Sequence, residues 1–189
     1  MTDLVFLPLS PDRWPDFETF FGRHRAVNGC WCMWWRIKRK EFEANHSAGN
    51  KAAMQAIVEA GDVPGLLAYD GDSPVGWISV APRADFPVLG RSPILKPVDD
   101  QPVWSIVCFF IHKAYRGQGL TARLIEAAVD YAAAHGATIV EGYPIAPRPD
   151  EGPHIYSFTG FLSTFQAAGF VEVARRSERR PIMRLHLPR

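Results

Sequence analysis

The fold of this chain is constrained most by a nearly continuous apolar run from Val103 to Ile111. The run is rich in β-branched and aromatic residues, which is typical of a central strand covered on both faces. A helix with one apolar face follows, formed by Leu120, Leu124, Ile125, Ala128, Val129 and Ala132. Thr138 to Tyr143 then predicts a second buried strand. This order requires a crossover connection, so the two strands are predicted to be parallel.

The remaining segments predict helices before this unit and strands on both sides of it. In chain order they are a helical region over 10–60 with its second helix at about 50–60, hairpin strands at 65–69 and 74–80, a loop with five prolines over 81–102, a short helix at 160–168, and strands at 170–175 and 182–187. Ser10 is the expected cap of the first helix. The predicted class is mixed α/β, in one domain over 1–189.

Composition excludes several classes of function. The formal net charge is only +1, so no global field draws the chain onto nucleic acid or an anionic membrane. The apolar stretches within Met1 to Leu9 are too short for a signal peptide, and no stretch reaches the length of a membrane span. Cys30, Cys32 and Cys108 do not form a disulfide framework. We therefore expect a soluble, cytoplasmic protein with free thiols.

The segment Tyr115 to Thr121 joins the central strand to the amphipathic helix. Its two glycines let the backbone turn tightly, so that consecutive N–H groups can converge on an anion at the helix N-terminus. Arg116 can add positive charge, and the Thr121 hydroxyl can donate to a phosphate oxygen. A purely structural turn is the alternative. The glycine spacing of dinucleotide-binding proteins and the Gly-Lys-Ser/Thr of nucleotide hydrolases are both absent.

The segment resembles the cofactor motif of the general-control-non-repressible-5-related N-acetyltransferase (GNAT) family. That motif is Arg or Gln, two residues, Gly, one residue, then Gly or Ala, and Arg116, Gly119 and Thr121 occupy its positions, with Thr121 departing from it. The order of elements also resembles the family from about residue 10 to 187. The resemblance implies a mostly antiparallel sheet with a splayed, parallel central pair and helices on both faces. It also implies acetyl-CoA as the acetyl donor, with 10–60 bordering the acceptor and 103–187 holding the cofactor-binding and C-terminal part.

The resemblance further implies how the cofactor binds. Main-chain groups of Phe109 and Ile111 are expected to pair with the pantetheine arm, and an N–H near Phe109 to polarise the thioester carbonyl. The full set of expected cofactor-binding residues is Phe109, Ile111, Arg116, Gly117, Gln118, Gly119, Leu120 and Thr121. For Cys108 the expected role is core packing, and a covalent acetyl-cysteine is the alternative.

Catalytic residues are harder to predict. Family members commonly carry a tyrosine acid at the position of Phe165, which cannot donate a proton. Tyr143 and Tyr156 are the substitutes nearest in sequence, and each also has a structural interpretation. Glu141 is the candidate base, because a carboxylate in an apolar strand must find a partner or face a cleft, and an ion pair is its alternative. His112 and His154 are weaker candidates.

The acceptor side is predicted from Trp31, Trp34 and Trp35, which form either a pocket wall or a core wedge. Zinc binding by Cys30 and Cys32 with His24 and His46 lacks the usual spacing, so no metal is expected. The run from Arg36 to Lys40 favours a solvated helix face over nucleic-acid binding. We expect an N-acetyltransferase for a small-molecule amine, with a homodimer possible through exposed strand edges; a non-catalytic acyl-CoA-binding or sensor module is the alternative.

Overall fold

The structure is a computed structural model, and it describes residues 3–23, 29–148 and 157–188. Within these residues the strands form one seven-stranded sheet in the order β1-β2-β3-β4-β5-β7-β6. The strands are β1 (Val5–Pro8), β2 (Gly65–Asp70), β3 (Ser73–Pro82), β4 (Trp104–Ile111), β5 (Ile139–Gly142), β6 (Val171–Arg175) and β7 (Pro181–His186). Among the described strands, β4 and β5 pair in parallel and the other neighbours pair antiparallel. The predicted mixed α/β class is therefore confirmed.

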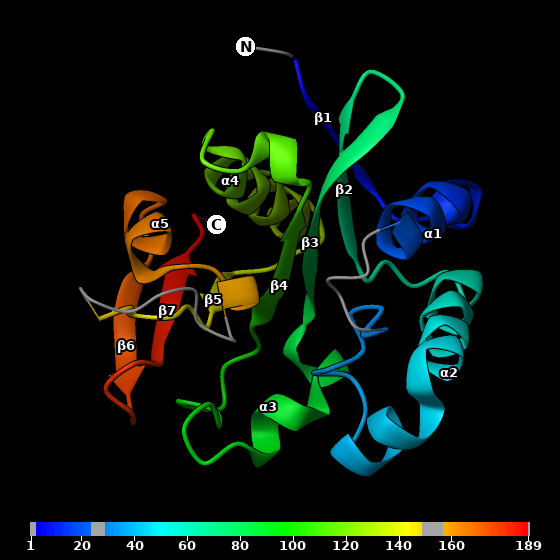
Figure 1. The fold of residues 1–189 in the computed structure, drawn as a ribbon. Helices are drawn as coiled ribbons and strands as arrows, with labels where there is room; N and C mark the ends of the chain where they lie inside the picture. Colours follow the sequence, from blue (N-terminus) through cyan, green and yellow to red (C-terminus); the bar gives the residue numbers. More distant parts are fainter. Residues whose placement is uncertain (1–2, 24–28, 149–156, 189) are drawn as a thin grey trace.

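Helices cover both faces of the sheet (Figure 1). They are α1 (Trp14–Arg23), α2 (Arg39–Glu59), α3 (Pro87–Arg91), α4 (Leu120–Ala134) and α5 (Leu162–Ala167), with 3-10 turns η1 (Pro11–Arg13), η3 (Arg83–Asp85), η4 (Lys113–Tyr115) and η5 (Ser157–Thr159). Two neighbouring residues of β3 pack on opposite faces of the sheet. Ile78 packs in the cluster that contains α4, whereas Trp77 packs in the cluster that contains α1.

Helix α4 is held by the apolar face that its sequence predicts. Leu120, Leu124, Ile125, Ala128 and Ala132 are all buried against the sheet. The helix can approach β3 closely at Gly76, where an added Cβ would lie 3.2 Å from the Leu120 side chain. This packing fixes the N-terminus of α4 at the end of β4, which is the part of the fold that matters for the site.

The N-terminal third differs from its prediction. The second helix begins at Arg39 rather than near Asn50, and it contains a non-helical residue, His46, with φ 49°. The positive φ angles of Trp31 and Cys32 turn the chain in a segment that had been predicted as helical. Strand β1 was not predicted, because its short apolar run gains strand structure only by pairing with β2.

The proline-rich segment 81–102 is also more structured than the predicted loop. It contains η3 and α3, and Pro87 occupies the first turn of α3, where its missing N–H costs nothing. Phe86, Leu89 and Leu95 of this segment are buried in a third cluster together with Trp35 and Tyr143. The segment therefore forms a folded wall beside the sheet.

Candidate active site

Strands β4 and β5 are paired over only a short distance. The register joins Trp104 to Val140, Ser105 to Glu141 and Ile106 to Gly142. At the same point β4 contains a bulge, since β3 pairs Ser79 with Cys108 and Val80 with Ile106, so that Val107 is an extra residue. Bulges often lie next to active sites, where they redirect a strand. Beyond Val107, β4 is paired with β3 on one side and with no strand of the described residues on the other.

The turn between η4 and α4 presents a row of backbone donors. Gly117 and Gly119 have φ angles of +73° and +78°, and an added Cβ on either would meet nothing within 4 Å. These glycines are therefore required by backbone conformation, and space remains above them. Within the described part of the chain, the N–H groups from Gly117 to Thr121 donate no hydrogen bond. Free N–H groups at a helix N-terminus form a binding site for an anion.

Two side chains hold this turn in place. The Arg116 Nε donates to the Ile111 carbonyl at 3.0 Å, and the Gln118 Nε2 donates to the Ala114 carbonyl at 2.6 Å. Leu120 points into the core, so that only its backbone is available to a ligand, whereas Thr121 is half-buried. The structure thus brings the predicted residues from Ile111 to Thr121 together at the end of β4, and their contact with a cofactor stays a prediction.

Glu141 and Tyr143, two of the predicted catalytic residues, lie in a buried polar network. The Glu141 carboxylate accepts hydrogen bonds from Arg83 Nη1 at 2.8 Å, from the Tyr143 hydroxyl at 2.6 Å and from Arg184 Nε at 2.7 Å. Both side chains are fully buried. A carboxylate with three donors on its oxygens has little capacity left to take a proton from a substrate. This geometry favours the ion-pair interpretation of Glu141.

The network extends in two directions from Glu141. The Tyr143 hydroxyl also lies 2.8 Å from the Ser105 Oγ and accepts a hydrogen bond from Arg83, and Arg184 forms two bonds to Asp99 at 2.7 and 3.0 Å. Burial, together with the adjacent Glu141 charge, raises the pKa of Tyr143 well above its usual value. Tyr143 is therefore a poor acid in this environment. Catalytic roles for Glu141 and Tyr143 remain predictions that the geometry does not support.

Phe165 is part of the core rather than of the opening beside β4. Its side chain is fully buried, and its ring meets the Phe109 ring with centroids 6.1 Å apart. A Cβ added to Gly142 would lie 2.2 Å from the Phe165 ring, and one added to Gly160 would lie 2.9 Å from it. The two glycines thus leave room for this ring. Tyr156, the other predicted acid, and His154 lie outside the described residues.

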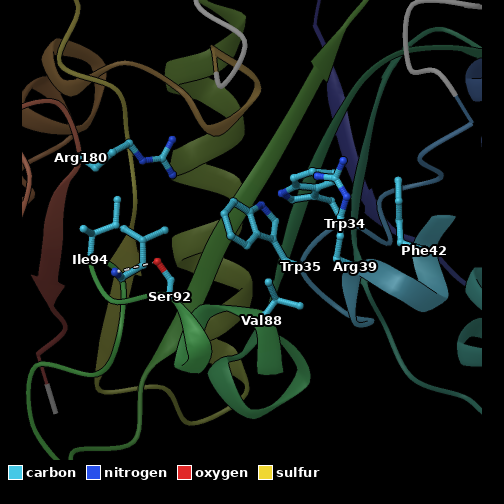
Figure 2. Close-up of a pocket in the computed structure, with 9 residues that line it drawn as sticks. Trp34, Trp35, Arg39, Phe42, Val88, Ser92, Ile94 and Arg180 are labelled. Atoms are coloured by element: carbon cyan, nitrogen blue, oxygen red, sulfur yellow. Dashed lines mark hydrogen bonds between the residues drawn. The ribbon is translucent and has the colours of Figure 1, made fainter.

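A cavity of about 250 Å³ lies on the side of the sheet that carries residues 31–35, here called the tryptophan segment (Figure 2). Its lining residues come from the tryptophan segment, α2, the 81–102 segment and the turn between β6 and β7; they are Trp34, Trp35, Arg39, Phe42, Val88, Ser92, Ile94, Leu95 and Arg180. Trp34 meets Phe42 edge-on at 5.3 Å. The prediction of a pocket wall therefore agrees with the positions of Trp34 and Trp35.

For Trp31 the geometry favours the alternative of a core side chain. Its indole Nε1 donates to Ser47 Oγ at 3.0 Å, and its ring stacks on Phe21 with centroids 6.0 Å apart. The positive φ angles of Trp31 and Cys32 turn the chain here. Trp31 is consequently buried in the aromatic core between α1 and the sheet, apart from the residues that line the cavity.

The structure adds functional candidates that the sequence did not indicate. Arg180 lines the cavity and Arg83 anchors the Glu141 network, although each lies in a connection between strands and no motif marks either. The only sequence signal was the unusual length of the proline-rich segment, which had suggested a functional loop.

Cys32 and Cys108 pack in the same core cluster. The Trp77 Nε1 donates to the Cys32 Sγ at 3.3 Å. The neighbouring Cys32 thiol, together with burial, raises the pKa of Cys108 well above its usual value, and the hydrogen bond from Cys108 lowers the pKa of Cys32. A thiol with a raised pKa is a weak nucleophile. The environment of Cys108 therefore favours core packing over a covalent acetyl-cysteine.

These features define a class of protein: a mixed α/β fold whose central parallel strands part beside a helix N-terminus where, within the described residues, the backbone N–H groups of Gly117 to Thr121 donate no hydrogen bond. A sequence model described as the acetyltransferase (GNAT) family matches residues 31–143, well over half of the chain, and the chain belongs to this family. The predicted resemblance is therefore confirmed, and so is the assignment to N-acetyltransferase enzymes as a class.

Solved structures of low sequence identity share the fold. A GNAT-family acetyltransferase from Streptococcus agalactiae is 10% identical, with 100% of this chain and 99% of that chain covered and a TM-score of 0.59. The Drosophila melanogaster polyamine N-acetyltransferase is 13% identical, with 98% and 100% covered and a TM-score of 0.56. The PaiA N-acetyltransferase from Thermoplasma acidophilum, solved with coenzyme A, is 13% identical, with 98% and 99% covered and a TM-score of 0.56.

Two further results concern curated sequences and membrane-spanning helices. Curated protein sequences gave no match to this chain. In the part of the chain that the structure describes, no helix is long and apolar enough to cross a bilayer.

Proposed function

We propose that this protein transfers the acetyl group of acetyl-CoA to the primary amine of a small-molecule acceptor. One observation carries the proposal: within the described residues, the N–H groups of Gly117 to Thr121 donate no hydrogen bond, and they lie at the end of β4, whose outer edge pairs with no described strand beyond Val107. Acetyl-CoA has matching chemistry, with a pyrophosphate for the helix N-terminus and a pantetheine arm whose amides can pair with a strand edge. The coenzyme A complex of a structural neighbour supports the same assignment.

In this proposal the chain supplies binding and polarisation. Gly117, Gly119 and their neighbours hold the pyrophosphate, and main-chain groups of Phe109 and Ile111 hold the arm. The amine attacks the thioester carbonyl, a C–N bond forms and the C–S bond breaks. A backbone N–H near Phe109 would stabilise the negative charge that develops on the carbonyl oxygen. With a thiol pKa of about 8.5, the departing thiolate needs little help from an acid.

The acceptor amine must lose a proton to react. Lysine-type amines have a pKa of about 10.4, so that only a small fraction is neutral at pH 7. The described residues that line the cavity include no carboxylate to take this proton. We therefore assign the proton to water, and expect the rate to rise with pH as the fraction of neutral acceptor amine rises.

Phe165 favours one other function, because this buried side chain has no proton that it could donate as the acid. A protein of this fold that binds acyl-CoA without turnover would act as a sensor. Membership in an enzyme family supports catalysis instead.

A single assay separates these two functions. The protein is incubated with acetyl-CoA and a panel of primary amines, released CoA thiol is measured with a thiol-reactive dye, and the acetylated amine is identified by mass spectrometry. Because the chain has three cysteines of its own, a reaction without amine gives the background. Amine-dependent thiol release with a matching acetylated product supports the transferase. Tight acetyl-CoA binding without release for any amine supports the sensor.

A further inference from the structure

We propose that the acceptor is a small apolar amino acid whose carboxylate binds to Arg180. This inference rests on the proposed function and names the acceptor class for the same site. It follows from three properties of the cavity: the charge of its lining, its size, and the way in which it is joined to β4.

The cavity lining is apolar with added positive charge. Of the nine lining residues that the structure describes, six are aromatic or aliphatic, two are arginines, one is Ser92, and none is acidic. A polyamine or an aminoglycoside carries several positive charges, and desolvating these beside arginines without carboxylate partners is unfavourable. An acceptor with an anionic group suits the lining, and its apolar part can contact the tryptophan rings.

The two arginines are not equivalent. Arg39 is exposed, forms an ion pair with Glu43 at 2.6 Å and lies over the Trp34 ring at 4.8 Å, so it belongs to the rim. Arg180 is only 6% exposed, and its Nη1 donates to the Thr159 Oγ1 at 3.3 Å. In Figure 2 the Arg180 side chain extends toward Trp35. A guanidinium held by its surroundings forms a planar pair of donors that matches a carboxylate.

A second donor lies in the same wall. The Trp35 Nε1 is buried and forms no hydrogen bond within the described part of the chain. A buried N–H without an acceptor costs free energy, so such groups usually have a partner. A carboxylate bound near Arg180 would bring acceptor oxygens to the side of the cavity that Trp35 forms.

The size of the cavity limits the acceptor. At about 250 Å³ it lies just below the range of about 300–1,000 Å³ that is typical of pockets for drug-sized ligands. A single amino acid is therefore a better match than an aminoglycoside or a folded peptide segment.

The cavity also lies beside the proposed reaction centre. Arg180 donates a hydrogen bond to Thr159 of η5. The η5 turn in turn packs against β4. At the next residue, Gly160, an added Cβ would lie 3.0 Å from the Phe109 ring. Trp35 shares its core cluster with Val107, the bulged residue of β4. A carboxylate held by Arg180 thus leaves the rest of the acceptor next to the strand that is proposed to hold the thioester.

The test compares matched amines with acetyl-CoA as the donor. Leucine, methionine, phenylalanine and tryptophan are each assayed beside their carboxamides, with spermidine as a polycation. A charge-assisted hydrogen bond contributes more binding free energy than a neutral one. We therefore expect kcat/KM for at least one amino acid to exceed that for its amide by about tenfold or more. Arg180→Gln should remove this preference, because kcat/KM should fall about tenfold more for the amino acid than for its carboxamide. The matched control is Arg91→Gln, an exposed arginine outside the cavity, which should keep the preference.

The outcomes separate the inference from the proposed function. If spermidine or the amides are acetylated better than the amino acids, the acceptor class is wrong and the transferase stands. If no amine is acetylated, the transferase fails, and calorimetry of the same amino acids in the presence of CoA decides the inference. Binding of an amino acid that Arg180→Gln removes and Arg91→Gln keeps supports the site, whereas no binding to the wild-type protein overturns it. If Arg180→Gln fails to fold, Arg180→Lys takes its place. Lysine keeps the positive charge but lacks the planar pair of N–H donors, so the preference for the amino acid should weaken.

Discussion

Replacing Glu141 by Gln tests whether the buried network is structural or catalytic. Its carboxylate accepts bonds from Arg83, Tyr143 and Arg184. A glutamine retains one oxygen, turns two N–H donors toward arginine and leaves buried positive charge without its counter-charge. Removing one partner of a buried pair costs about 3–5 kcal/mol. For a chain of this size 1 kcal/mol lowers Tm by roughly 2–4 °C, so we expect a loss of roughly 6–20 °C.

The assay combines thermal unfolding, followed by circular dichroism, with kcat and acetyl-CoA affinity measured where both proteins are folded. Glu172→Gln is the matched control, because Glu172 pairs with Arg175 near the surface and such pairs are worth about 0–1 kcal/mol. We expect a large fall in Tm for Glu141→Gln alone, with kcat per folded molecule changed less than tenfold. An unchanged Tm with kcat reduced more than a hundredfold would refute this reasoning and make Glu141 the base.

The remaining predictions concern the same two regions. Phe165→Tyr should lower the free energy of unfolding by about 1–3 kcal/mol without raising kcat, because the added hydroxyl is buried against Gly142 and Gly160; a gain in kcat would show that this position reaches the reaction centre. Folding raises the pKa of Tyr143, so the protonated hydroxyl contributes to the stability of the fold. This contribution is complete below about pH 10, the pKa of an unfolded tyrosine, and it is lost as the pH rises toward the folded pKa. In urea titrations Tyr143→Phe should therefore lose less stability than the wild type between about pH 9 and 11, and equal losses would contradict the assignment.

The sequence predicts the part of the fold in which local signals agree. From Val103 to Tyr143, hydrophobic period, helix amphipathicity and glycine placement all indicate the same βαβ unit, and β4, α4 and β5 confirm it. The N-terminal third was less predictable, since Trp31 and Cys32 adopt positive φ angles that their residue types do not favour. Such angles are stabilised by tertiary packing, which no local pattern reports.

The candidate site divides in the same way. The glycine turn is contiguous, so its residues can be recognised from the sequence alone. The cavity and the polar network are assembled from distant segments, and contacts such as Arg83 with Glu141 depend on how the proline-rich segment folds over the sheet. The role of Trp31 stayed open in the sequence for this reason, because spacing alone does not distinguish a pocket wall from a core side chain.

The central claim is that the turn before α4 binds the pyrophosphate of acetyl-CoA, and a pair of matched variants tests it most directly. Gly119 and Gly136 lie at opposite ends of α4 with φ angles of +78° and +81°, and an added Cβ would meet nothing within 4 Å at either. Valine should therefore strain the backbone equally at both, by about 1–2 kcal/mol. Calorimetry with acetyl-CoA should show Gly119→Val weakening affinity by about a hundredfold or more, through lost N–H contacts, and Gly136→Val leaving it unchanged. Equal affinities for the two variants would contradict the account.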